Sequence, residues 1–128
     1  MATVLIVDDE PQIVELVRFT LEDERLRVVE AADGAEALAV ARAELPDLIF
    51  LDVQMPRLDG FEVCRHFRQD PELGRAKIVM LTASGQEVDR ARGWAVGADE
   101  YLTKPFSPLK LLSLVQALLP EGPLWLGG

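Results

Sequence analysis

Five polar residues follow short apolar runs along the chain, at positions where their side chains can share one reaction site. Asp8 and Asp9 follow the run TVLIV, and Asp52 follows LIFL. Thr82 follows IVML, and Lys104 closes the short run YLTK. Three carboxylates crowded together repel one another unless a cation relieves the repulsion. Carboxylates, a hydroxyl and an ammonium group in this pattern predict a divalent-cation site that handles a phosphoryl group.

The predicted ligands favour Mg²⁺, which binds one or two carboxylates and leaves positions for water and phosphate; Mn²⁺ could substitute. An aspartate beside such an ion can attack phosphorus and form an aspartyl-phosphate. Lys104 and the Thr82 hydroxyl would then stabilise the charge on the phosphoryl oxygens. Zinc is not expected, because Cys64 and His66 are single candidates inside a predicted helix, where packing or surface roles are favoured.

The elements that must position these residues alternate along the chain. The predicted strands are 3–7, 27–30, 48–51, 78–81 and 101–102. Three of them are continuously apolar, which is typical of parallel strands covered by helices on both faces. The predicted helix starts are Pro11, Asp33 with Glu36, Asp59 with Gly60, Ser84 with Glu87, and Ser107 with Pro108, and Pro120 ends the last helix.

Five successive βα units predict a doubly wound α/β fold with a parallel sheet and right-handed crossovers. In such a sheet the carboxyl ends of the strands meet at one edge, which is where ligands bind. The predicted elements therefore bring the polar residues described above together.

Composition sets further limits. The 128 residues fit one domain, and the 49% of hydrophobic residues favours a packed core over disorder. The net charge of −9, with scattered basic residues, argues against binding of nucleic acid. We find no apolar run of roughly 20 residues and no secretory signal before Thr3, so we expect no membrane association and a cytoplasmic location.

Four motifs together carry a resemblance to a known family. The stretches VDDEP, LDVQMPRLDG, MLTAS and GADEYLTKPF resemble, in this order, the receiver domains of two-component response regulators. The similarity extends from the first strand to the last helix. It implies a (βα)5 sandwich of the flavodoxin-like type, with a parallel sheet of order 2-1-3-4-5 and five flanking helices.

The resemblance implies a role for each residue at the metal. Asp52 would be the phosphoacceptor. Asp9 and Asp52 would ligate Mg²⁺ directly together with the main-chain carbonyl of Gln54, and Asp8 would act through water. Such a protein is a switch rather than an enzyme, although it assists its own Mg²⁺-dependent phosphorylation and its autodephosphorylation.

Four further roles follow from the same resemblance. Thr82 would move toward the attached phosphoryl group, and Lys104 would pair first with the carboxylate and then with the phosphate. Tyr101 matches the family's switch aromatic, whose ring turns inward when Thr82 moves. The peptide bond before Pro105 matches one that is cis in the family.

Two other classes of protein fit the sequence less well. A phosphatase of the haloacid dehalogenase type needs a second aspartate two residues after the nucleophile, where this chain has Gln54. A flavodoxin-like flavin carrier needs a Ser/Thr/Gly phosphate loop after the first strand, and the acidic stretch DDEP would repel that phosphate. Both alternatives are therefore disfavoured.

We expect residues 1–120 to form the receiver and residues 121–128 to be a tail or the start of a linker. The implied phosphodonor is a histidine kinase or a phosphotransfer protein, which would dock on the first helix and on the loop after the fifth strand. The implied output face comprises the fourth helix, fifth strand and fifth helix, and it would contact a partner, an output domain or a second copy. Leu114 and Gln116 replace the arginines of winged-helix-type receivers, and Leu114 is predicted on the outer face. A stand-alone protein and a module of a longer regulator both remain open.

Overall fold

The structure, a computed structural model, describes residues 2–55, 59–83 and 94–119. The strands are β1 (Ala2–Val7), β2 (Leu26–Ala31), β3 (Leu48–Asp52), β4 (Lys77–Ala83) and β5 (Glu100–Lys104). The helices are α1 (Pro11–Leu21), α2 (Gly34–Glu44), α3 (Gly60–Gln69) and α5 (Pro108–Leu118). Residues 94–96 are also helical, whereas the predicted start of that helix at Ser84 lies outside the described residues.

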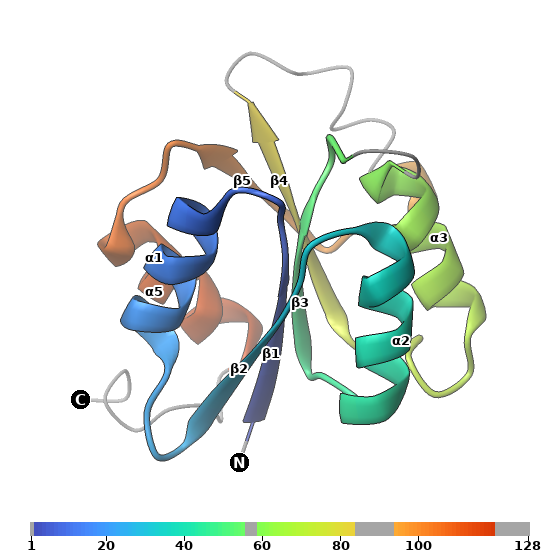
Figure 1. The fold of residues 1–128 in the computed structure, drawn as a ribbon, viewed down its shortest axis with the longest axis horizontal. Coiled ribbons are helices and arrows are strands. Elements are labelled where there is room, and N and C mark those ends of the chain that lie inside the picture. Colours follow the sequence, from blue (N-terminus) through green and yellow to red (C-terminus); the bar gives the residue numbers. More distant parts are fainter. Residues whose placement is uncertain (1, 56–58, 84–93, 120–128) are drawn as a thin grey trace.

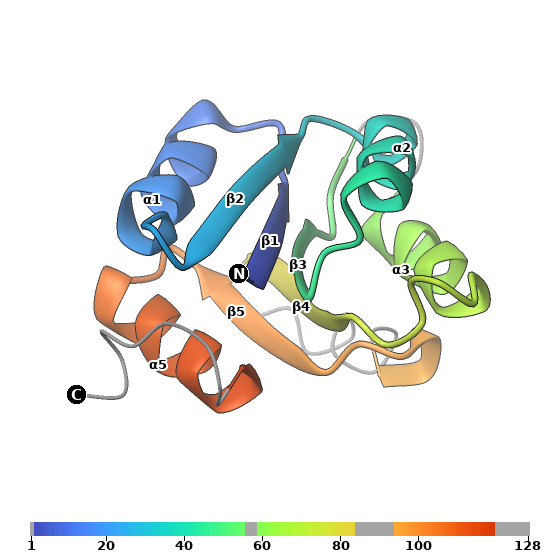
Figure 2. The same cartoon turned by 90° about the horizontal axis from the view of Figure 1, so that it is seen from below.

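All neighbouring strands run parallel in one sheet of order β2-β1-β3-β4-β5. Helices α1 and α5 cover one face, and α2 and α3 cover the other (Figures 1 and 2). The predicted doubly wound fold and strand order are confirmed.

The central strands are apolar on both faces because each face meets a layer of helices. On β1, Val4 and Ile6 pack with the residues under α1 and α5, whereas Leu5 and Val7 pack under α2 and α3. The two largest fully buried side chains, Phe50 and Phe67, belong to these two separate clusters. The continuously apolar runs in the sequence therefore reflect burial on both sides of the sheet.

Three helices begin at side-chain caps that the sequence predicts. Asp33 accepts a hydrogen bond from the Glu36 amide at 2.8 Å, and Asp59 accepts one from the Glu62 amide at 3.0 Å. Ser107 caps α5 by accepting a hydrogen bond from the amide of Lys110. Such caps satisfy amide groups that the first helical turn leaves without partners.

The predicted outer position of Leu114 is wrong. Leu114 is partly buried and packs against the core beneath α5, together with Leu112 and Leu118. Helix α5 lies beside α1 and therefore buries a wider apolar stripe than a helix on a bare sheet edge. The exposed leucine of α5 is instead Leu109, near its start.

Cys64 is fully buried on α3, as predicted for a packing residue, and burial raises the pKa of its thiol to about 11. His66 is exposed on the same helix. Among the described helices, none combines the length and apolar character that crossing a bilayer requires.

Candidate functional site

The register of the sheet brings four predicted residues to one edge. Asp8 directly follows β1, and Asp52 ends β3, which pairs with β1 on one side and with β4 on the other. Thr82 lies opposite Thr103 on β5, next to Lys104. Asp8, Asp52 and Thr82 are buried, whereas Asp9 is exposed.

One lysine provides the positive charge at the centre of this site. The Nζ atom of Lys104 lies 2.7 Å from Asp8 Oδ2, 2.9 Å from Glu10 Oε1 and 3.5 Å from Asp52 Oδ2. Glu10 was not singled out in the sequence, although its position next to the aspartate pair was a usable signal. Among the described residues, Asp8 Oδ2 is buried without a hydrogen bond of good geometry, and its polar contact is the ion pair with Lys104.

Backbone amides fix the two buried carboxylates. The amide of Gln54 donates to Asp52 Oδ1 at 3.1 Å, and the amide of Glu10 donates to Asp8 Oδ1 at 2.9 Å. In both cases the donor lies two residues after the aspartate, so the chain turn at the end of each strand orients the side chain. The second oxygen of each carboxylate is left to face Lys104.

The electrostatics of the site favour a cation. Burial, with the nearby charge of Asp8, raises the pKa of Asp52 to about 6. Burial likewise raises the pKa of Asp8 above its ordinary value, although Lys104 opposes the change. Burial disfavours the Lys104 ammonium, but its bonds with Asp8 and Glu10 outweigh this effect and raise its pKa. The buried carboxylates are thus only partly compensated by the lysine.

Four carboxylates are close enough to bind one ion. Asp8, Asp9, Glu10 and Asp52 each offer an oxygen, and these oxygens lie within 4.8 Å of one another. A set of hard oxygen donors matches the preference of Mg²⁺ or Mn²⁺ and not that of softer metals. The residues present therefore fit the predicted metal.

The aromatic residue predicted as a switch, Tyr101, lies on β5 opposite Met80, two residues before the Thr82–Thr103 pair. The Tyr101 side chain is buried, and its ring packs against that of Trp94 in a T-shaped arrangement with a centroid separation of 5.2 Å. Trp94 itself is 51% exposed. The Lys104–Pro105 peptide bond at the end of β5 is cis, as the resemblance implied.

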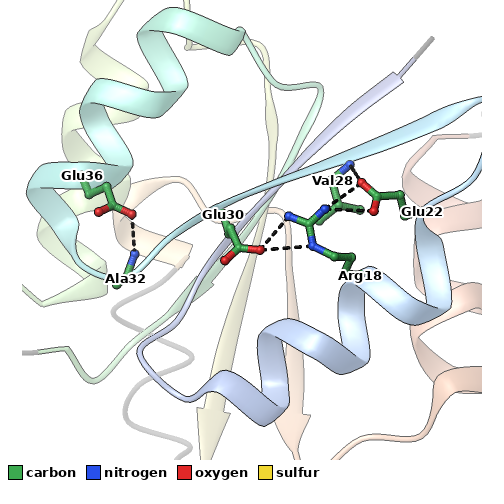
Figure 3. A network of polar contacts seen from close by, with 6 residues as sticks. All are labelled: Arg18, Glu22, Val28, Glu30, Ala32 and Glu36. Atoms are coloured by element: carbon green, nitrogen blue, oxygen red, sulfur yellow. Dashed lines mark hydrogen bonds and ion pairs between the residues drawn. The ribbon is translucent and has the colours of Figure 1, made fainter.

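A polar network joins α1 to β2 next to the carboxylates of the site (Figure 3). Arg18 bonds both oxygens of Glu22 and also Glu30, at 2.6 Å, and Glu22 accepts a hydrogen bond from the Val28 amide. A hollow of about 380 Å³ lies between these elements, and its lining includes Asp8, Asp9 and Arg18. The network holds α1 against β2, the strand that pairs with β1 next to the site.

A doubly wound sheet with clustered carboxylates and a lysine at its carboxyl edge defines a phosphoryl-handling α/β domain, and comparisons with known proteins identify the family. The model of the response regulator receiver domain matches residues 4–116. The chain belongs to this family and is a receiver domain of two-component response regulators, whose members are phosphorylated on aspartate.

Several relatives are transcriptional regulators. The chain is 48% identical over 116 residues to the alkaline phosphatase synthesis transcriptional regulatory protein PhoP of Bacillus subtilis (strain 168), covering 91% of the chain and 48% of that protein. It is 44% identical to the phosphate regulon transcriptional regulatory protein PhoB of Rhizobium meliloti (strain 1021), with 91% and 51% covered. The chain thus spans about half the length of the curated relatives it matches.

A solved structure of similar size is the chemotaxis response regulator CheY4 of Vibrio cholerae. It is 42% identical, superimposes with a TM-score of 0.87, and is covered to 99%, against 93% of this chain. A putative response regulator from Chloroflexus aurantiacus J-10-fl has the same TM-score at 38% identity, with 98% of that chain and 93% of this one covered.

Proposed function

We propose that Asp52 is the phosphoacceptor of this receiver. Its carboxylate ends a central strand, is held by the Gln54 amide and faces Lys104, and this arrangement is the observation that carries the proposal. A carboxylate oxygen of Asp52 attacks phosphorus while the bond from phosphorus to the donor breaks. With phosphohistidine as donor, the electron pair returns to the imidazole nitrogen, which takes up a proton.

We propose Asp8, Asp9, Asp52 and the main-chain carbonyl of Gln54 as the residues that hold Mg²⁺. The ion would supply charge neutralisation at the phosphoryl oxygens. Lys104 provides a second positive charge, and Thr82 provides a hydroxyl from the neighbouring strand. Because the strand ends are buried and exclude water, the interactions of Lys104 and Thr82 with the phosphoryl oxygens are stronger than they would be in solvent.

Intact-mass measurement tests this assignment. The purified chain is incubated with Mg²⁺ and acetyl phosphate, beside an Asp52→Asn variant and a sample with EDTA. We expect one added phosphoryl group in the wild type with Mg²⁺ and none in either control. After removal of the donor, the wild-type mass should return to its starting value by autodephosphorylation. An Asp52→Asn variant that gains the same mass would contradict the assignment.

We propose that Thr82 and Tyr101 transmit phosphorylation to the face that includes β5 and α5. Trp94 packs against the Tyr101 ring, so its emission reports any movement of that ring. In a Trp125→Phe background, phosphorylation should shift the Trp94 emission to the red as the contact loosens. The shift should be absent with Asp52→Asn and smaller with Thr82→Ala. Identical spectra before and after phosphorylation would contradict this role.

We propose that the phosphodonor, a histidine kinase or phosphotransfer protein, docks on α1. Phe19 is 91% exposed there and lies near Leu16 on the open outer surface of the helix. Large aromatic side chains commonly dominate the binding energy of interfaces.

Phe19→Ala should lower the rate of phosphoryl transfer from a kinase about tenfold, the worth of a lost aromatic contact. The kinase for this experiment is chosen from a set of purified histidine kinases as the one that phosphorylates the wild-type chain fastest. Transfer from acetyl phosphate should stay unchanged, as should both rates in His66→Ala, an exposed aromatic on the far layer. If Phe19→Ala lowered the rate of phosphoryl transfer equally with the kinase and with acetyl phosphate, Phe19 would contribute to folding rather than to docking.

We propose that the output is a protein contact on β5, α5 and the helical residues before β5. The exposed indole of Trp94 lies in this region. Asp99, an acid at this face, is already paired with Arg68 of α3 at 2.6 Å. The transcriptional regulatory proteins named above suggest a transcriptional output in a longer protein, whereas the CheY4 structure, which this chain covers to 99%, suggests a receiver without a second domain.

A further inference from the structure

Glu10 heads helix α1 but does not cap it. Its side chain makes no cap hydrogen bond, whereas Asp33, Asp59 and Ser107 all cap their helices. The Glu10 carboxylate turns to the site instead, with Oε1 2.9 Å from Lys104 Nζ and Oε2 accepting from the Gln12 side chain at 3.1 Å. Short side chains are preferred at this helix position, so a glutamate here points to a purpose other than capping.

The contact with Glu10 draws Lys104 toward β1. An ammonium group has three donors, and the two shortest contacts of Lys104 are with Asp8 and Glu10. Its distance to Asp52 Oδ2 is 3.5 Å, the longest of the three. A phosphoryl group on Asp52 needs Lys104 as a counter-ion, so Lys104 has to exchange at least one of these partners.

Glu10 is the partner that Lys104 can exchange most readily. The Glu10 side chain is 45% exposed, whereas that of Asp8 is fully buried. In the metal-free protein, a released Glu10 carboxylate is solvated by water, but a released Asp8 carboxylate would be buried without a counter-ion.

We propose that Glu10 is a positioning residue that holds Lys104 in a resting position away from Asp52 and so slows capture of a phosphoryl group. The inference rests on the proposed phosphorylation of Asp52. When the phosphoryl group arrives, Lys104 exchanges the Glu10 carboxylate for a phosphoryl oxygen. Glu10 then returns to solvent without touching the reacting atoms.

Two substitutions separate position from charge. Glu10→Gln removes the charge, and Glu10→Asp keeps it but shortens the side chain by one methylene and favours capping of α1. Glu15→Gln is the matched control, because Glu15 lines the hollow beside Asp8 and Asp9. Among the described residues, it is not one of the carboxylates within 4.0 Å of Lys104.

We expect both Glu10 variants to be phosphorylated by acetyl phosphate about two- to fivefold faster than the wild type, the range of a half-exposed ion pair. The gain should lie in the maximal rate, with the half-saturating donor concentration unchanged. Glu15→Gln should match the wild type. If only the negative charge mattered, Glu10→Gln and Glu15→Gln would both lower the half-saturating concentration of acetyl phosphate. Glu10→Asp, which keeps the charge, would then have the wild-type rate.

A second measurement needs no phosphorylation. The chain has three lysines, so the side-chain ¹⁵Nζ and ¹³Cε resonances of Lys104 can be assigned by substitution. In metal-free protein, they should shift in both Glu10 variants and not in Glu15→Gln. Unshifted resonances, or variants with wild-type rates, would overturn the inference alone. A wild type that takes up no phosphoryl group would overturn the proposed function as well.

Discussion

Replacing Gly60 with alanine is expected to lower the free energy of unfolding by about 3 kcal/mol, at the upper end of overpacking effects. A Cβ atom at Gly60 would overlap the carbonyl oxygen of Asp52 and would lie 2.9 Å from the Cα of Val53. These neighbours are backbone atoms of the segment that carries Asp52, the proposed phosphoacceptor, so they cannot move without displacing the site. Uptake of a phosphoryl group should therefore also fall in the fraction that stays folded.

Gly74→Ala is the matched control. Its nearest contacts would be carbonyl oxygens at 3.3 and 3.4 Å, a much smaller overlap than at Gly60. Urea unfolding of both variants, followed by circular dichroism, measures the difference. A Gly60→Ala variant as stable as Gly74→Ala would show that the start of α3 does not press on the end of β3 as described.

The Asp52→Asn variant is expected to be more stable than the wild type in the absence of metal at pH 7.5, by about 2–3 kcal/mol. The pKa of Asp52 is raised from 3.8 to about 6 in the folded state, chiefly by burial and then by the charge of Asp8. The folded state consequently binds more protons than the unfolded chain between these values. Stability from this residue is therefore present below about pH 4 and is lost as the pH rises through 6.

Urea unfolding at several pH values checks this expectation. The advantage of Asp52→Asn should shrink toward zero near pH 4, where the wild-type carboxyl is protonated. Millimolar Mg²⁺ should stabilise the wild type more than the variant, because ligands stabilise the state that binds them. Asp33→Asn, which preserves a helix cap, is the control and should change stability little. A less stable Asp52→Asn variant at pH 7.5 would contradict the electrostatic description.

The fold was largely predictable because each element leaves a local signal. The apolar runs of β1, β3 and β4 require helices on both faces, and the alternation with helices requires a parallel sheet. Strand ends were less predictable, since Thr82 and Lys104 are still paired within β4 and β5 rather than following them. Main-chain pairing continues beyond the apolar residues, because it does not depend on side-chain type.

The site was predictable as a set of residues but not as a network of contacts. The strand-end rule brings Asp8, Asp52 and Lys104 together, and the structure confirms this convergence. The contact between Glu10 and Lys104 spans most of the chain length and depends on a rotamer that no local pattern specifies. The predicted position of Leu114 failed for a related reason, because the stripe that α5 buries depends on the neighbouring α1.

The central claim is that the phosphoryl group is attached to Asp52, and mapping of the modified residue tests it most directly. The chain is phosphorylated with acetyl phosphate and Mg²⁺, the acyl phosphate is reduced with borohydride, and the peptides are sequenced by mass spectrometry. We predict conversion of Asp52 alone. Conversion of Asp8, Asp9 or Glu10 instead, or no conversion in a protein that binds Mg²⁺, would contradict the assignment.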